Sequence, residues 1–359
     1  MTLINADDID DIALGATVLG TGGGGDPHVG KLVAQQAIEQ HGPVELISPD
    51  SLDDDAFVVP TAQMGAPTVA VEKVPGGGEP AASLSRVERE CGRTADATMP
   101  IECGGINSTF PFAVAAEKGI PLVDADGMGR AFPELQHETF NIYGVDGTPA
   151  AVSDERGNTC LLDTTTNEQL EWLARGITVR MGGVGYIADY PMTGKEVKET
   201  AIPETMSLAA AIGAAVRDAG ENVVDAISEV TSDSIYGSAI SLFEGKIVDV
   251  KRRNERGFVL GHVELEGFGP DDGETMEIEF QNENLGAAID GEYVATVPDL
   301  ITIMDHESGD PIPTERLHYG ARTRVLGIPT PPIMRSDAAL DVWGPRTFGL
   351  ETDYTPMTH

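Results

Sequence analysis

The sequence predicts an α/β N-terminal domain, a mixed sheet with helices, followed by a β-rich α+β C-terminal domain. Short apolar runs alternate with helical patterns up to about residue 165, as in an α/β layer. From residue 240 onward, runs that alternate apolar and polar residues dominate, as in half-buried strands. A polar stretch over residues 163–168 separates the two patterns, so we expect domains at 1–165 and 166–359.

In the first half, helices are expected where apolar residues recur every three or four positions. Acidic residues precede the first such segment, 9–19, and suit the positive end of a helix. Further helices are expected at 29–40, 81–91 and 112–118. The short apolar runs predict strands at 44–47, 56–59, 68–71 and 122–123.

The second half begins with a less regular pattern. Residues 170–173, 177–180 and 184–188 fit strands or a mixture of strand and helix. An alanine-rich segment, 205–219, ends at Gly220 and predicts a helix, with another over 223–230. Alternating runs then predict strands at 245–250, 258–265, 276–280, 293–297 and 323–328.

Charge and composition exclude several classes of protein. The chain has 59 acidic and 23 basic residues, and its net charge of −36 repels nucleic acid and anionic membranes. No apolar run approaches the roughly 18 residues of a membrane span, and the N-terminus lacks the basic segment of a signal peptide.

Three cysteines without a spaced pair fit a reducing compartment, so we expect a cytoplasmic protein. A dispersed acidic surface with few Lys is typical of a halophilic organism. The alternative interpretation is an acidic binding partner for a cationic protein.

A run of glycines after the first expected helix is a candidate ligand-binding loop. Gly22, Gly23, Gly24 and Gly25 cost chain entropy, which a sequence retains where the backbone must approach something closely. Asp26 and His28 follow at the exit of the loop, and both can bind a metal ion or a proton. The alternative is a flexible tight turn between two helices.

A second glycine cluster predicts another close backbone approach. Gly104 and Gly105 are flanked by Glu102, Cys103 and Asn107. Asn107 is alternatively the N-cap of the helix that follows. Cys103 is a candidate zinc ligand or nucleophile, although no His is adjacent to activate it.

Asp124 and Asp126 follow an apolar run, and alternate residues of a strand share one face. Ligand sites in open α/β sheets gather at the carboxyl ends of strands. Two carboxylates on one face repel each other unless a cation, a proton or an Arg lies between them. Arg130 and a divalent metal are the candidates for that cation, and a purely structural Asp pair is the alternative.

The C-terminal half adds fewer candidates. Asn282 and Glu283 end an alternating strand and are positioned to bind a polar ligand across the domain cleft, with turn formation as the alternative. His318 lies near the start of a strand and is either a ligand or a structural residue. Neither the serine-hydrolase nor the zincin motif occurs.

Four blocks occur in one order along the chain: 19–27, 104–108, 124–134 and 282–285. Together they resemble the S-methyl thiohydantoin desulfurase family, which is often encoded near hydantoinase-type genes, over nearly the whole chain. The Asp-x-Asp-Gly-x-Gly-Arg-Ala-Phe-Pro-Glu block is the most specific part. The resemblance implies the two-domain architecture and zinc-assisted hydrolysis of a five-membered cyclic substrate.

We therefore expect a metal-dependent hydrolase of a (thio)hydantoin-like ring that releases a thiol. A bound metal lowers the pKa of its water to about 7, and the hydroxide would attack the ring carbon between two nitrogens. The expected Zn²⁺ ligands are Asp124, Asp126, His28, Cys103 and His318.

The remaining site residues would bind substrate or move protons. Glu102 or Glu134 would transfer the proton, and Arg130 would orient carboxylates or a substrate anion. The two glycine clusters, Asn107, Asn282 and Glu283 would bind the ring. The alternatives are a hydantoinase-like ring-opening amidohydrolase and a non-catalytic ligand-binding or assembly subunit. A homo-oligomer, a dimer or a tetramer, is expected in each case.

Overall fold

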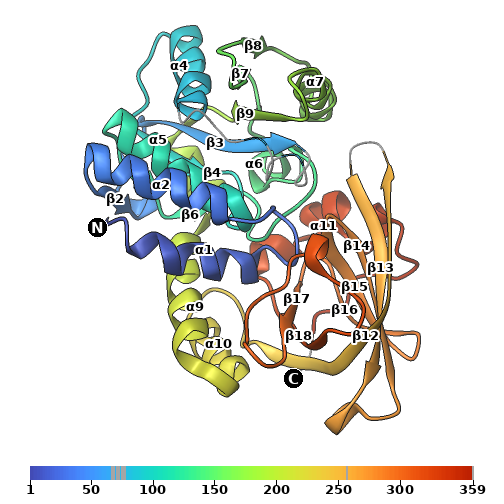
Figure 1. The fold of residues 1–359 in the computed structure, drawn as a ribbon. Helices are drawn as coiled ribbons and strands as arrows, with labels where there is room; N and C mark the ends of the chain where they lie inside the picture. The colour runs from blue at the N-terminus through green and yellow to red at the C-terminus, as the bar shows by residue number, and fades with distance from the viewer. Residues whose placement is uncertain (66–68, 70–72, 74–77, 256–257, 358–359) are drawn as a thin grey trace.

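The computed structural model describes residues 1–65, 69, 73, 78–255 and 258–357. Two sheets, one from each half of the chain, are joined by a group of helices (Figure 1). The predicted fold class is therefore confirmed: a mixed α/β layer comes first and an antiparallel sheet second. The strand expected at 68–71 falls, except for residue 69, outside the described residues.

The first sheet has nine strands of mixed direction. Its neighbours run in the order β1 (Thr2–Ile4), β2 (Val44–Ile47), β5 (Leu122–Val123), β4 (Ala97–Pro100), β3 (Phe57–Gly65), β9 (Val184–Ala188), β7 (Ala150–Ser153) and β8 (Thr159–Leu162), and β10 (Met192–Thr193) pairs with β3. The central strands β2, β5, β4 and β3 are parallel, whereas the other pairs are antiparallel.

Helices cover both faces of this sheet, which explains why its central strands are apolar on both sides. α4 (Glu79–Cys91) and α5 (Phe110–Lys118) pack on the face that carries Phe57 and Val59. α7 (Asn167–Arg180) packs on the opposite face, with Ala62 and Met64. The boundary expected near residue 165 falls between β8 and α7, and β9 and β10 beyond it return to the first sheet.

The segments 170–173 and 177–180, expected as strands or a mixture of strand and helix, contain no strand: both belong to the single helix α7. The side chain of Thr166 accepts a hydrogen bond from the amide of Gln169 and so caps its first turn. Leu170 and Ala174 lie four residues apart and are fully buried. That spacing is typical of a helix. The apolar residues of this segment also form two short runs in the sequence, and those runs suggested strands.

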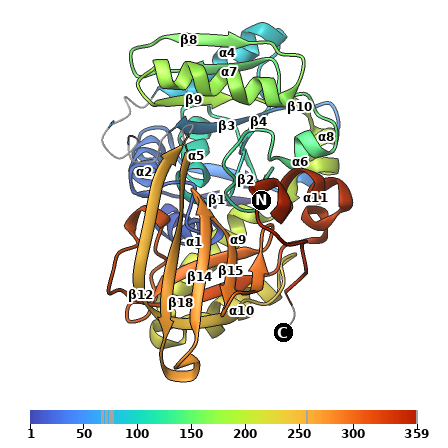
Figure 2. The same cartoon turned by 90° about the vertical axis from the view of Figure 1, so that its right-hand side faces the viewer.

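The second sheet has seven antiparallel strands and is strongly curled (Figure 2). Its order is β16 (Glu292–Thr296), β15 (Glu283–Ile289), β14 (Thr275–Gln281), β13 (Phe258–Gly267), β12 (Ile240–Glu255), β18 (Arg322–Ile328) and β17 (Leu300–Asp305). Register shifts along β12 at Ser241/Phe243 and Ile247/Asp249 are bulges, which increase local twist and bend the strand. The concave face packs its own core, with Phe243 and Val263 among its members.

The remaining elements connect the two sheets. They are α1 (Asp8–Leu19), α2 (His28–His41), α6 (Thr139–Ile142), the small sheet of β6 (Ala125–Asp126) and β11 (Ile202–Pro203), α8 (Gly194–Thr200), α9 (Thr205–Ala219), α10 (Val223–Ser232) and α11 (Asp337–Trp343). One continuous core includes Leu19 of α1, Ile212 of α9 and Leu300 of β17. The hydroxyl of Thr302 donates to the carbonyl of Val18, 2.7 Å away. The two sheets therefore share a core around α1. Within the described residues, no helix is long and apolar enough to cross a membrane.

Two glycines allow α1 and α9 to pack unusually close. A Cβ on Gly15 would lie 1.8 Å from the carbonyl oxygen of Ala209, and one on Gly213 would lie 1.9 Å from that of Asp11. We predict that Gly213→Ala lowers the free energy of unfolding by about 1–3 kcal/mol, because the helices must separate. Chemical denaturation measures the change.

Gly176→Ala is the matched control, because Gly176 also lies inside a helix, α7, and no atom lies within 4 Å of its added Cβ. There alanine is expected to stabilise the protein by up to about 1 kcal/mol through its higher helix propensity. Equal effects of the two substitutions would contradict the close packing of α1 and α9.

Candidate functional site

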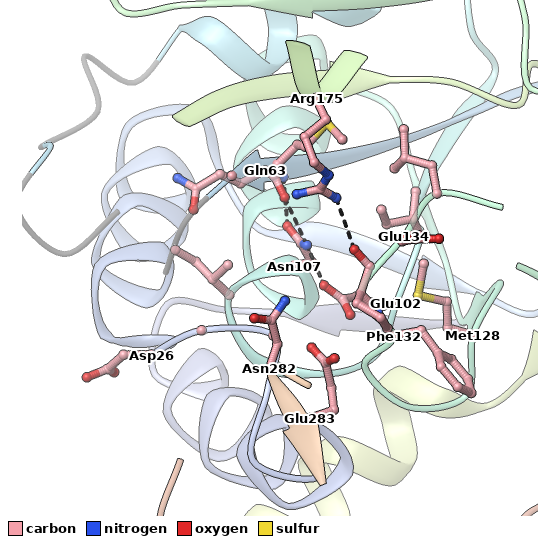
Figure 3. Close-up of a pocket in the computed structure, with 18 of the residues that line it drawn as sticks. Asp26, Gln63, Glu102, Asn107, Met128, Phe132, Glu134, Arg175, Asn282 and Glu283 are labelled. Carbon is pink, nitrogen blue, oxygen red and sulfur yellow. Dashed lines mark hydrogen bonds between the residues drawn. The ribbon is translucent and has the colours of Figure 1, made fainter. Parts of the chain in front are cut away.

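A pocket lies where the glycine loop, the second glycine cluster and the turn between β14 and β15 meet (Figure 3). It encloses about 790 Å³, part of which is open to solvent. Its lining residues come from six segments: 24–29, 63–65, 101–107, 128–135, Arg175 and 282–283. The predicted residues Gly24, Gly25, Glu102, Glu134, Asn107, Asn282 and Glu283 all line it.

The glycines allow two loops and a glutamate to touch. A Cβ on Gly23 would lie 2.3 Å from Oε1 of Glu283, and one on Gly105 would lie 2.4 Å from the carbonyl carbon of Gly24. Gly22, Gly24 and Gly25 also have positive φ angles of 84°, 72° and 75°, which other residues rarely adopt. The close approach expected from the sequence is therefore made to other parts of this chain, with one side of the loop left to the pocket.

Glu102 is buried and held by Asn107. The side-chain amide of Asn107 donates from Nδ2 to Glu102 Oε1 at 2.5 Å, while its Oδ1 accepts from the amide of Gln63 at 2.7 Å. Since Nδ2 also donates to the carbonyl of Gln63, strand β3 fixes the orientation of this amide. Asn107 is therefore a positioning residue for Glu102 and makes no cap bond to α5. The other oxygen of Glu102, Oε2, is buried without a hydrogen-bond partner in the described part of the chain.

Glu283 enters the same pocket from the second sheet. Its side chain is buried, and its Oε2 has no hydrogen-bond partner among the described residues. Burial raises the pKa of Glu283 to about 8, although the positive charge of Arg130 opposes this shift. Burial and the neighbouring charge of Glu283 likewise raise the pKa of Glu102 well above its ordinary range. The two carboxyl groups therefore interact, and they cannot both be ionised at little cost.

Asn282, directly before Glu283, forms the turn between β14 and β15. It has a positive φ of 59°, and its Oδ1 accepts from the amide of Val259 at 2.9 Å. This hydrogen bond fixes the orientation of the side-chain amide, so Nδ2 is the group that remains available to a ligand in the pocket. Asn282 thus makes the turn and also lines the site.

Arg130 is completely buried and joins the glycine loop to the second sheet. It donates to Thr21 Oγ1 at 2.7 Å and to the carbonyl oxygens of Asn284, Asp299, Pro298 and Ala131 at 2.7, 2.9, 3.3 and 3.1 Å. Burial lowers its pKa to about 10, so the guanidinium is charged at neutral pH. Its hydrogen bonds go to no carboxylate within the described residues, and it does not line the pocket. The geometry gives Arg130 a structural role in place of the expected contact with the Asp pair.

Asp124 and Asp126 accept hydrogen bonds from different backbone segments. Oδ1 of Asp124 accepts from the amides of Met206 and Ser207, both at 3.0 Å, at the start of α9. Oδ2 of Asp126 accepts from the amides of Cys103, Met128 and Gly129 at 2.9, 3.1 and 2.8 Å. The expectation that one strand presents both on one face is wrong, since Asp124 lies between β5 and β6.

The other expected zinc ligands are dispersed. His28 and His318 are exposed and do not line the pocket. Cys103 is buried, and burial together with the charge of Asp126 raises the pKa of its thiol well above the ordinary range. Among the residues that the structure describes, no three His, Cys, Asp or Glu side chains are grouped as a metal ion requires. The five residues do not fit a zinc ion in this arrangement.

Sequence reasoning missed Gln63 and Arg175, and a buried acid pair next to the site. Glu138 and Asp189 are fully buried, and none of their four carboxyl oxygens has a hydrogen-bond partner in the described part. Burial raises the pKa of Asp189 to about 8, and burial together with the charge of Asp189 raises that of Glu138 well above its ordinary range. Glu138 lies four positions after the block 124–134. Nothing in the surrounding sequence distinguishes it from an acidic residue on the surface.

Glu134 stands at the mouth of the pocket. Its side chain is 27% exposed, and it accepts a hydrogen bond from the side chain of Gln136. Burial and the neighbouring Glu171 raise its pKa. Glu134 therefore lies between the pocket and solvent.

Two family models together match residues 7–357 of the chain. The N-terminal domain model of the S-Me-THD-like family matches residues 7–164, and the C-terminal domain model matches residues 165–357. An X-ray structure of a protein from Chromobacterium violaceum is similar over 100% of both chains, with a TM-score of 0.83 and 22% identity, which is a likeness of fold. None of the curated proteins matches the chain. The chain belongs to the S-Me-THD-like family.

Proposed function

We propose that the protein hydrolyses an S-methyl thiohydantoin-like ring, releasing methanethiol and leaving the hydantoin. Water adds to the ring carbon between the two nitrogens, and the carbon–sulfur bond breaks. The base takes one proton from water, and the acid supplies one to the ring nitrogen. When the carbon–sulfur bond breaks, the added hydroxyl becomes the carbonyl and its proton goes to the departing sulfur. The base then returns its proton to the acid. One observation carries the proposal: two buried glutamates from the two halves of the chain line one pocket, and each has one oxygen without a hydrogen-bond partner among the described residues.

The different surroundings of the two glutamates suggest their roles. Burial raises the pKa of Glu283 to about 8, but Arg130 and the backbone amides of Glu283 and Gly24 favour its ionised form. Burial and the charge of Glu283 raise the pKa of Glu102 well above its ordinary range, although Asn107 donates to it. Glu283 therefore loses its proton first, and we assign it as the general base. Glu102 keeps its proton and is the general acid.

The glycine loop would stabilise the charge that builds on the ring. Gly24 and Gly25 line the pocket with backbone and no side chain, so a planar ring can lie directly against their peptide groups. Preorganised amide donors of this kind stabilise a developing negative charge without reorganisation. Phe132 and Met128 supply an apolar wall for the ring.

Thiol release from an S-methyl thiohydantoin, followed with a thiol-reactive chromophore, tests the proposal. Formation of one hydantoin for each thiol is the expected result. A ring-opening amidohydrolase would instead yield an N-carbamoyl product and no thiol, and a binding subunit would bind the ring without turnover. Mass analysis of the product distinguishes these outcomes.

Turnover is predicted to rise as pH rises through about 8, because Glu283 then becomes the carboxylate that takes a proton from water. At higher pH turnover should fall again, because Glu102, whose pKa is raised by burial and by the charge of Glu283, then loses the proton that it must donate. The profile of kcat/KM against pH reports both groups. Activity that is already maximal at pH 6 would contradict the role of Glu283.

Zinc dependence stays a prediction from the sequence, and we derive no step through a metal. The carboxyl mechanism predicts that protein dialysed against a chelator keeps its rate of thiol release. It also predicts that Asp124→Asn weakens the start of α9 without abolishing turnover. Metal content per chain is measured on the same samples. About one zinc per chain, lost together with activity, would restore the metal mechanism and require a rearranged ligand set.

A further inference from the structure

We infer that the outer face of helix α7 binds a second copy of this chain, with the two helices antiparallel about a two-fold axis. α7 lies across the side of the molecule that Figure 2 turns toward the viewer, on the outside of the first sheet. A groove of about 2290 Å³, much of it open to solvent, runs along it, and its walls come from α7, the β7–β8 hairpin and Phe258. Only Glu134 and Arg175, among the described residues, line both this groove and the candidate site, and binding here does not depend on the proposed reaction.

α7 carries a stripe of exposed apolar side chains that its own fold does not cover. Leu170 packs toward the first sheet and is buried, whereas Trp172, Leu173 and Val179 are 75%, 39% and 62% exposed. Ten large hydrophobic side chains are exposed in the described part of the chain, and three of them lie on this one helix. The other tryptophan, Trp343, is fully buried. Single exposed apolar residues are ordinary, but a contiguous group is typical of an interaction surface.

The charge of the groove favours a copy of this chain over a strongly charged partner. The described lining has four acidic and three basic side chains, so the groove is nearly neutral. The whole chain, by contrast, has 59 acidic and 23 basic residues. Two copies therefore repel each other over most of their surfaces, and least where this groove lies. A cationic partner would be attracted more strongly to the acidic surface elsewhere.

The order of residues along the exposed face makes that face complementary to itself. Glu168 lies in the first turn of α7 and Arg180 in the last, and neither forms an ion pair in the described part of the chain. In an antiparallel pair of helices, Glu168 meets Arg180 of the partner subunit, and the two-fold axis repeats the contact. The same register places Trp172 opposite Gly176 of the partner subunit. Because no atom lies within 4 Å of a Cβ built on Gly176, the indole has room there.

The helix dipole offers another explanation of the two charges, since it also favours an acid in the first turn and a base in the last. It does not explain why Trp172 and Val179 are exposed between them. Glu168 and Arg180 are twelve residues apart, about 18 Å along the helix. Within one chain they are therefore too far apart to pair, so a dependence of one on the other requires contact between two copies.

Analytical ultracentrifugation of the whole protein, over a range of concentrations in dilute and in molar KCl, tests this interface. We expect a reversible dimer that is tighter in molar KCl, because salt screens the repulsion between two chains of net charge −36. Trp172→Ala should raise the Kd of the dimer about 30-fold or more, the effect of truncating a central interface residue. Tyr319→Ala is the matched control, because Tyr319 is an aromatic residue that is 71% exposed and lies outside the groove.

Reversal of the two end charges tests the antiparallel arrangement. Glu168→Arg and Arg180→Glu should each raise the Kd about 10- to 100-fold, because like charges then meet across the interface. The double variant, which carries both changes, should dimerise nearly as well as the native protein. The dipole explanation predicts the opposite, since the double variant then has the least stable helix and no gain in association. Circular dichroism establishes that each variant is folded.

Native protein that stays monomeric in both salt concentrations would overturn the inference and leave the groove to a different molecule. A dimer whose Kd is unchanged by Trp172→Ala would place the interface elsewhere and overturn it too. If both single charge reversals weaken the dimer and the double variant does not recover, the antiparallel pairing of Glu168 with Arg180 is wrong.

Discussion

Glu102→Gln is expected to lower kcat by about 10²- to 10⁴-fold, the usual contribution of a general acid. Glutamine keeps an oxygen that can accept from Asn107 Nδ2, so the fold and the pocket shape should be retained. Only the ability to donate a proton to the ring nitrogen is lost. Substrate binding, measured through KM or by calorimetry with the hydantoin product, should change little.

Glu117→Gln is the matched control, because it makes the same chemical change on the exposed surface of α5. Glu102→Gln and Glu283→Gln together should cost little more than either alone, since residues that act as a unit are not additive. Thiol release at the native rate by Glu102→Gln would remove Glu102 from the mechanism.

Arg130→Met should produce the largest loss of stability, about 3–5 kcal/mol, because five buried acceptors lose a charged hydrogen-bond donor. The substitution deletes five hydrogen bonds and leaves one hydroxyl and four carbonyl oxygens without that donor. Lysine cannot replace arginine here, because a single ammonium group cannot reach partners spread around a planar fork. Urea denaturation measures the change.

Arg346→Met provides the control, because Arg346 is exposed and pairs with the exposed Asp353. Surface pairs contribute at most about 1 kcal/mol, so this variant should unfold near the native midpoint. Should Arg130→Met unfold there too, the link that Arg130 makes between the glycine loop and the second sheet would contribute nothing to stability.

Glycine was the most informative residue in the sequence, for a physical reason. Glycine adopts positive φ angles far more readily than other residues, and only glycine permits contacts as short as those at Gly23 and Gly105. Such positions are rare outside constrained loops, so they mark where separate segments meet. The residues predicted beside them, Glu102, Asn107 and Glu283, line one pocket.

The expected metal ligands were harder to predict than the glycine loops. A carboxylate accepts hydrogen bonds from backbone amides as readily as it binds a cation. Asp124 and Asp126 accept main-chain donors at the start of α9 and near β6, and nothing local in the sequence distinguishes that use. Arg175 was missed for a different reason. Its place in the pocket depends on how α7 packs against the first sheet, and the segment that forms α7 was interpreted partly as strand.

The division of the two glutamates between the sheets makes the chain functionally indivisible. Glu102 comes from the half matched by the N-terminal family model, and Glu283 from the half matched by the C-terminal one. Either family domain, if it occurs alone in another protein, would lack one partner of the proton-transferring pair and could not carry out this reaction unaided. Mixing two separately produced halves should regain activity only to the extent that they reassociate.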